Sequence, residues 1–131
     1  MRLNDLYLIA FAVSLGCTAA AVPSSGPTPR RSTFVTAAEI RDANVELGSA
    51  YDAIARLRPN WLTHVTETFT NPPRREFARV FVDGRFYGEL ESLRNFDASQ
   101  IADVRFYSAA ESGRFGLEGG LSGVIEITTK K

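Results

Sequence analysis

Few side chains that commonly carry out chemistry occur in this chain, and they stand apart from one another. His64 is the only histidine, and no serine occurs in the nucleophile-elbow setting that a histidine-activated serine requires. Cys17 is the only cysteine, which excludes an internal disulfide and a cysteine-based metal cluster. Carboxylates occur singly, with Asp83 in a turn pattern and Glu39 and Glu46 on expected helix surfaces. The sequence therefore predicts no catalytic residue, no metal site and no cofactor, and a small enzyme of unknown reaction is only the third alternative.

Five glycines between residues 113 and 123 invite comparison with a phosphate-binding loop. No Lys-Ser/Thr pair follows them, and their spacing fits neither nucleotide-binding fingerprint. Glycines this dense are typical of left-handed backbone positions and tight corners. We interpret the segment as a structural corner between two strands.

The charge balance limits the class of partner. The chain has 131 residues, with 15 basic and 15 acidic side chains and a formal net charge of zero. Nucleic-acid binding depends on a basic face that neutralises phosphates, so the sequence predicts no nucleic-acid partner. At 44% hydrophobic residues the chain can form a core, and its length suits one domain plus a targeting segment.

The N-terminal residues have the pattern of an export signal. An apolar run from Leu6 to Gly16 has the length of a signal-peptide core and ends at Cys17. Two cleavages compete: a lipoprotein-type cleavage before Cys17, with lipid attached to that residue, or ordinary cleavage after Ala21. An uncleaved membrane anchor is the third reading, but it needs about twenty apolar residues. We predict that residues 1–21 are a signal peptide, that the protein is exported, and that Cys17 links it to a membrane.

A linker separates this signal from the folded part. Residues 18–32 contain Pro23, Pro27 and Pro29, with Val22 as their only large apolar side chain. A segment of this composition cannot bury enough surface to fold, so we expect a flexible tether. The remaining residues, 33–131, are predicted to form one domain.

Two short helices are predicted at the start of the domain. Thr36 and Glu39 form a capping-box pattern, and Gly48 is suited to end the helix that follows. A second helix is expected to begin at Ser49 and to stop before Pro59. Its buried stripe follows helical spacing at Ala50, Ala53, Ile54 and Leu57.

Alternating apolar residues predict the strands. Residues 76–83 and 85–88 read as a hairpin around the Asp83-Gly84 turn, and residues 101–107 and 123–129 as two strands with one buried and one wet face. Short strands are also expected at 33–35 and at 64–69 within a mobile loop, and a short helix at 90–96. The predicted core comprises Ile40, Ile54, Leu57, Val80, Val82, Val104, Phe106, Ile125 and Ile127.

The segment from Ile101 to Lys131 resembles the end of the plug domain of TonB-dependent outer-membrane receptors. The resemblance is carried by a strand, a small helix ending in the pair Phe115-Gly116, and a strand that reads Gly-Val-Ile-x-Ile-Thr-Thr-Lys. The Val-Phe-Val-Asp-Gly-Arg stretch at residues 80–85 resembles the plug's Val-x-Val-Asp-Gly hairpin. One departure is at residues 108–110, where Ser-Ala-Ala replaces the Arg-Gly-Pro corner of the receptors.

The resemblance implies a plug-like α+β fold, with a small mixed sheet of about four strands and two or three short helices. It also implies a non-catalytic binding or accessory domain of the cell envelope, attached to the outer membrane or periplasmic. Residues 18–31 contain no convincing box for the TonB protein, so energy-coupled uptake is not expected. The alternative is a structural partner that caps or docks on a separately encoded outer-membrane β-barrel or envelope complex.

Four side chains are candidates for a partner-contact patch. Arg74, Arg75, Arg85 and Tyr87 lie on or near the expected hairpin, and arginine and tyrosine dominate interface hot spots. The alternative is that Arg85 and Tyr87 simply occupy the wet face of the hairpin. The sequence does not identify a small-molecule ligand.

We predict that the exported protein is acylated on Cys17, because the apolar run stops there and a proline-rich tether follows. Metabolic labelling with an alkyne analogue of palmitate should mark the wild-type protein and leave Cys17→Ser unmarked. Equal labelling of both proteins, or of neither, would contradict lipid attachment and leave ordinary secretion.

Overall fold

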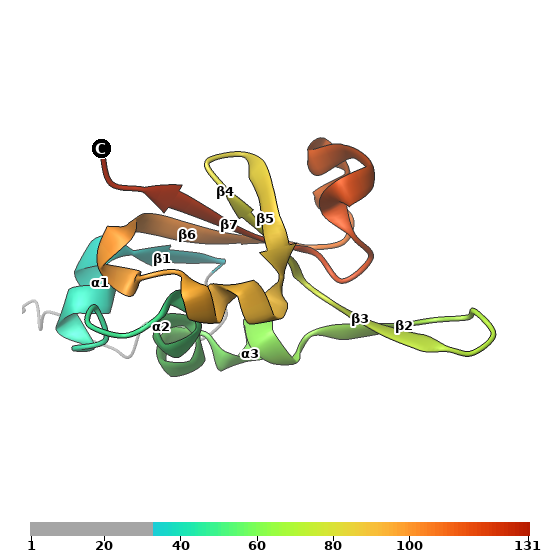
Figure 1. The fold of residues 1–131 in the computed structure, drawn as a ribbon, viewed down its shortest axis with the longest axis horizontal. Coiled ribbons are helices and arrows are strands. Elements are labelled where there is room, and N and C mark those ends of the chain that lie inside the picture. Colours follow the sequence, from blue (N-terminus) through green and yellow to red (C-terminus); the bar gives the residue numbers. More distant parts are fainter. Residues whose placement is uncertain (1–32) are drawn as a thin grey trace, which may run out of the picture.

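The computed structural model describes residues 33–131, so the signal peptide, Cys17 and the tether lie outside the described residues. The domain has two layers, a mixed β-sheet and a layer of short helices packed on one of its faces (Figure 1). This arrangement confirms the predicted α+β class. Within residues 33–131, no helix is long and apolar enough to cross a membrane.

The main sheet has five strands in the order β1-β6-β7-β4-β5. All neighbouring pairs are antiparallel except β4 and β7, which run parallel. The predicted small sheet of about four strands thus gains a fifth, because the short edge strand β1 also pairs with β6. The strands are β1 (Phe34–Thr36), β4 (Arg79–Val82), β5 (Arg85–Glu89), β6 (Ile101–Tyr107) and β7 (Val124–Thr129).

The last strand, β7, lies in the centre of this sheet. It pairs with β6 on one side, where Val104 faces Ile127 and Phe106 faces Ile125, and with β4 on the other. The predicted pairing of the two C-terminal strands is therefore confirmed. The Asp83-Gly84 turn also joins β4 and β5 as predicted, with both residues at positive φ.

The first helix, α1 (Ala37–Asp42), begins with the predicted capping box. The Thr36 hydroxyl accepts a hydrogen bond from the Glu39 amide at 3.2 Å, and the Glu39 carboxylate accepts one from the Thr36 amide at 3.1 Å. The helix ends earlier than Gly48, because Asn44 takes a left-handed conformation with φ 55°. The Asn44 amide then bonds to the Arg41 carbonyl and the Val45 amide to the Ile40 carbonyl, which satisfies the last turn.

The second helix, α2 (Ala50–Leu57), has the predicted bounds and a second capping box, between Ser49 and Asp52. A third helix, α3 (Pro59–Thr63), starts at once, since proline at the first helical position costs no hydrogen bond. It places Trp61 in the core at 2% exposure. The other helical turns are of the 3-10 type: η1 (Leu90–Asn95), where a short helix is predicted, η2 (Ala98–Gln100) and η3 (Ser112–Gly119).

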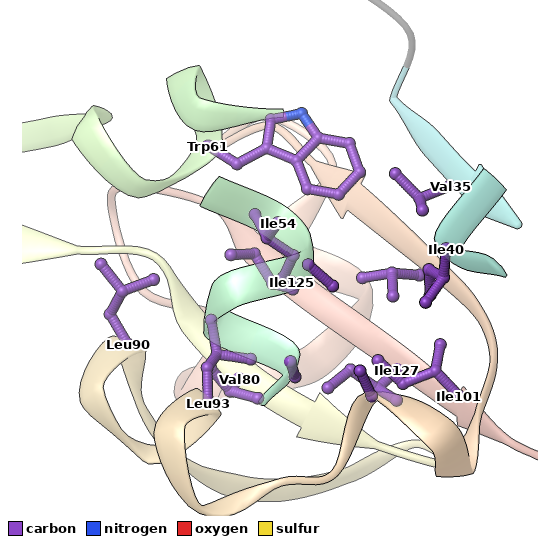
Figure 2. Close-up of a cluster of buried hydrophobic side chains, with 14 of the residues drawn as sticks. Val35, Ile40, Ile54, Trp61, Val80, Leu90, Leu93, Ile101, Ile125 and Ile127 are labelled. Atoms are coloured by element: carbon purple, nitrogen blue, oxygen red, sulfur yellow. The ribbon is translucent and has the colours of Figure 1, made fainter. Parts of the chain in front are cut away.

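The main core fills the space between the sheet and the helices (Figure 2). Six of the nine predicted core residues are buried in it: Ile40, Ile54, Val80, Val104, Ile125 and Ile127. The other three, Leu57, Val82 and Phe106, are half-buried and pack against its border. Phe106 lies at this border because its ring stacks on Trp61, with the ring centroids 5.7 Å apart.

The opposite face of the sheet is not uniformly wet, which corrects the prediction for Tyr107 and Val124. These two residues are 7% and 0% exposed and form a second apolar cluster with Phe81. The segment η3 covers this end of the sheet and brings Phe115 against the cluster, 4.6 Å from the Phe81 ring and 5.1 Å from the Tyr107 ring. Strand alternation reports which residues share a face, and tertiary packing decides whether that face is covered.

Because β7 is central, we predict that Ile127→Ala lowers the free energy of unfolding by roughly 2–4 kcal/mol through lost burial and an unfilled cavity. The neighbouring exposed Thr128→Ala is the control and should cost about 0.5 kcal/mol or less. Denaturant unfolding followed by circular dichroism measures both. Equal losses in the two variants would show that the inner face of β7 is not part of the core.

Candidate functional site

Two strands form a hairpin outside the main sheet, and we call residues 65–77 the arm. The strands β2 (Val65–Thr68) and β3 (Arg74–Phe77) are antiparallel, and the arm extends away from the rest of the domain (Figure 1). The predicted short strand at 64–69 is confirmed. The end of the expected loop, Arg74 and Arg75, instead belongs to β3, which takes Glu76 and Phe77 from the strand predicted at 76–83; the rest of that strand is β4 in the main sheet. No other strand in the part of the chain that the structure describes pairs with β2 or β3.

A buried serine connects the arm to the domain. The Ser122 hydroxyl accepts a hydrogen bond from the Thr66 amide at 2.9 Å and donates one to the Glu76 carbonyl. Thr66 and Glu76 are register partners, so the hydroxyl is bonded to a backbone group on each strand at the base of the arm. The Thr66 hydroxyl also donates to the Leu121 carbonyl at 3.3 Å. The glycine-rich corner thus holds the base of the arm in place.

The two faces of the arm differ in exposure. Thr66 and Glu76 lie toward Ser122 and are half-buried. The residues next to Thr66 and Glu76 in each strand point to the other face, because side chains alternate along a strand, and these residues are exposed. We call this set the outer face of the arm. Its strand residues are Val65, Glu67, Arg75 and Phe77.

A hollow of about 460 Å³ lies along β3, at the base of the arm. Three of the lining residues are arginines and three are glutamates, so the hollow has no net charge. Such a lining is unsuited to a polyanion but can contact the mixed side chains of a polypeptide. The lining residues are Arg74, Arg75, Glu76 and Phe77 of β3, Arg79 of β4, Glu89 of β5, and Leu90 and Glu91 of η1.

The structure divides the predicted contact patch between two hollows. Arg74 and Arg75 line the hollow beside the arm, whereas Arg85 and Tyr87 line another of about 520 Å³ along β5. The Tyr87 ring is 43% exposed and meets the edge of Phe96 at a centroid distance of 5.8 Å. The patch as a binding surface stays a prediction.

The ionisable groups with shifted pKa values have structural causes. Hydrogen bonds from the Thr129 side chain and backbone lower the pKa of Asp83, and similar bonds from Ser49 and Ser108 lower those of Asp52 and Glu111. Burial raises the pKa of Tyr107. Each of the three carboxylates fastens a turn or a helix start, which is a structural task.

The groups considered for chemistry are not assembled into a site. His64 packs the edge of its ring against Phe106, at a centroid distance of 5.9 Å. Among residues 33–131, no three histidine, cysteine or carboxylate side chains lie close enough together to hold a metal ion. Every buried side-chain nitrogen or oxygen in the described part of the chain has a hydrogen-bond partner. The arm and its hollow are therefore the candidate site, and binding is the task that their geometry supports.

Comparison with known proteins gives a limited result. No protein-family model matches the chain, and no curated protein matches it. Among solved structures it is similar to the ferric enterobactin receptor (PfeA) in its crystal structure with BCV-L6, with 17% sequence identity and a TM-score of 0.49. The matched region covers 75% of this chain and 17% of the receptor chain. A likeness of this degree carries no conclusion about function.

Ser122 was not recognised from the sequence, because its partners are 46 and 56 residues away in the chain. We predict that Ser122→Ala increases hydrogen exchange at the amides of β2 and β3 and leaves β6 and β7 protected. The Thr66 amide and the Glu76 carbonyl lose their partner, which costs about 1–3 kcal/mol where such groups stay buried. Ser92→Ala is the control, because its hydroxyl donates to the Glu89 carbonyl of β5 rather than bonding a backbone group of the arm. Unchanged exchange in the arm would contradict the role given to Ser122.

Proposed function

We propose that this protein is a non-catalytic binding or accessory domain of the cell envelope that docks on another envelope protein through its arm. The observation that carries the proposal is the arm itself. It leaves the two-layer domain, its strands pair with no further strand among the described residues, and its outer face is exposed.

An arm of this kind is energetically unfavourable for a domain that has no partner. A two-stranded hairpin is marginally stable in water unless its apolar face packs on something else. Open strand edges also invite pairing with other chains, and proteins usually shorten or cover them. Here Phe69 at the tip is fully exposed, and Val65 and Phe77 are 40% and 46% exposed. Exposed apolar side chains on an ordered projection favour a partner.

The hollow along β3 supports a polypeptide as that partner. It adjoins the open edge of β3, where an extended segment would gain main-chain hydrogen bonds by strand addition. Arg74 and Phe77 offer a charged and an apolar contact beside that edge. This is consistent with part of the contact patch predicted from the sequence.

The proposed location rests on the N-terminal sequence. An apolar run followed by Cys17 and a proline-rich tether is the layout of an exported domain held by a lipid anchor. We propose attachment to the outer membrane, with the domain facing the periplasm or the surface. A periplasmic protein without lipid is the alternative that follows from cleavage after Ala21.

A structural partner role is the second candidate function. In this reading the domain caps or docks on a separately encoded β-barrel, or on a larger envelope complex. The resemblance of residues 101–131 and 80–85 to receptor plug domains favours it. The two candidate functions differ in the identity of the partner protein. An experiment that identifies this protein therefore distinguishes them.

Photocrosslinking from the arm tests the proposed function. The photoreactive analogue benzoylphenylalanine is placed at position 69 in the full chain and activated by light in intact cells. Position 47 is the matched control, since Leu47 is 99% exposed and lies near Arg41 of α1, the helix at the end of the domain opposite the arm (Figure 1). We expect position 69 to crosslink to one defined envelope protein other than this chain, whether or not it also crosslinks to a second copy, and position 47 to give no such product.

The identity of the crosslinked protein separates the candidates. A β-barrel protein in the product supports the structural-partner role, and another envelope protein supports the accessory role. Equal crosslinking from both positions, or a cytoplasmic product from position 69, would contradict the proposed function.

A further inference from the structure

The residues that lie opposite each other on the outer face of the arm are complementary in charge and in apolar character. In register, Val65 lies opposite Phe77, and Glu67 lies opposite Arg75. The first pair is apolar. The second is an ion pair with 3.3 Å between the Arg75 Nε and Glu67 Oε1 atoms, exposed on both sides at 73% and 66%. Each strand therefore carries one member of each complementary pair.

This pairing has a geometric consequence for two copies of the chain. When a second arm is turned by 180° about the long axis of the first and laid on the outer face, each β2 lies over the β3 of the other copy. Val65 then meets the partner's Phe77, and Glu67 meets the partner's Arg75. A two-fold interface requires a patch that is complementary to itself, and the outer face meets this requirement for charge and for apolar contact.

The strand residues of the outer face are exposed in a single copy. The inner face of the arm, with Thr66 and Glu76, is the one that lies against Ser122 and the Leu121 carbonyl. The outer face consequently points away from the glycine-rich corner. The arm also extends beyond the rest of the domain (Figure 1), and at its base the outer-face residues Arg75 and Phe77 line the hollow shared with β5 and η1.

We propose that two copies of this protein associate through the outer faces of their arms, packed face to face around a two-fold axis along the arm. Stacking would cover Val65, Phe69 and Phe77, whose exposure in a single copy is otherwise unfavourable. It would also place each carboxylate between two guanidinium groups, and each guanidinium between two carboxylates. The face has no net charge, which disfavours a strongly acidic or basic occupant.

The contact area between the two arms is small, so we expect the dimer to be weak. Five side chains per copy bury much less than the roughly 800 Å² per partner of a standard stable interface. We therefore expect a reversible, concentration-dependent dimer. Sedimentation velocity of the full chain in detergent measures it, over about a hundredfold range of protein concentration. Cys17→Ser is included in every variant so that neither lipid nor an intermolecular disulfide contributes.

A charge exchange tests the pairing itself. Glu67→Arg places arginines against arginines in the interface and should raise the dissociation constant at least about tenfold. The double variant Glu67→Arg with Arg75→Glu restores every pair with the charges exchanged, so it should dimerise like wild type. Asp42→Arg is the matched control, because Asp42 is exposed at the end of α1, which lies at the end of the domain opposite the arm (Figure 1), and this exchange should leave the dimer unchanged.

The result separates this inference from the proposed function. A wild-type protein that stays monomeric at every concentration would overturn the dimer, as would a dimer that Glu67→Arg does not weaken or that the double variant fails to restore. Crosslinking of position 69 to a different protein, with a monomeric purified chain, would assign the outer face to that partner instead.

Discussion

One carboxylate holds the N-terminal third of the domain together. Glu39 accepts the Thr36 amide at the start of α1 with one oxygen and the Arg58 guanidinium with the other, at 2.9 Å. Arg58 is 3% exposed and also donates to the carbonyls of Phe34 and Leu57. Edge strand β1, helix α1 and the end of α2 thus meet at one buried charge. Removing Glu39 would leave the Arg58 charge buried without its carboxylate, a loss that typically costs about 3–5 kcal/mol.

The glycine-rich corner connects this body to the arm. A Cβ at Gly123 would overlap the Tyr107 carbonyl, and φ there is 91°, so only glycine lets the chain pass into β7 at this point. The preceding residue, Ser122, is thereby directed to the arm, while η3 earlier in the corner places Phe115 over the second apolar cluster. A segment without catalytic groups therefore positions both the cover of the sheet and the candidate site.

The features predicted correctly from sequence are local ones. The capping box at Thr36, the helix start at Ser49 and the Asp83-Gly84 turn depend on residues within three positions of one another, and all three form as predicted. Asn44 was an available local signal for the end of α1, since asparagine tolerates the left-handed conformation better than most residues. Ser122 had no such signal, because its partners come from a hairpin far away in the chain.

Exposure was the harder quantity to predict. Tyr107 and Val124 occupy the face that alternation assigned to solvent, and only the path of η3 explains why they are buried. The candidate arginines were grouped because they are close in sequence, whereas the chain carries them to separate hollows. The export signal and Cys17 depend on the sequence alone and remain predictions.

The position of β7 bears on the order in which the domain can form. This strand follows all the others in the chain, yet it lies in the middle of the sheet and pairs in parallel with β4, more than forty residues earlier. The parallel pair with β4 closes a long loop and forms slowly, and neither β4 nor β6 has its central neighbour until β7 arrives. The sheet is thus incomplete until the chain is available through residue 129. A chain that reaches only to β6 therefore lacks the strand that joins the pair β1-β6 to the pair β4-β5.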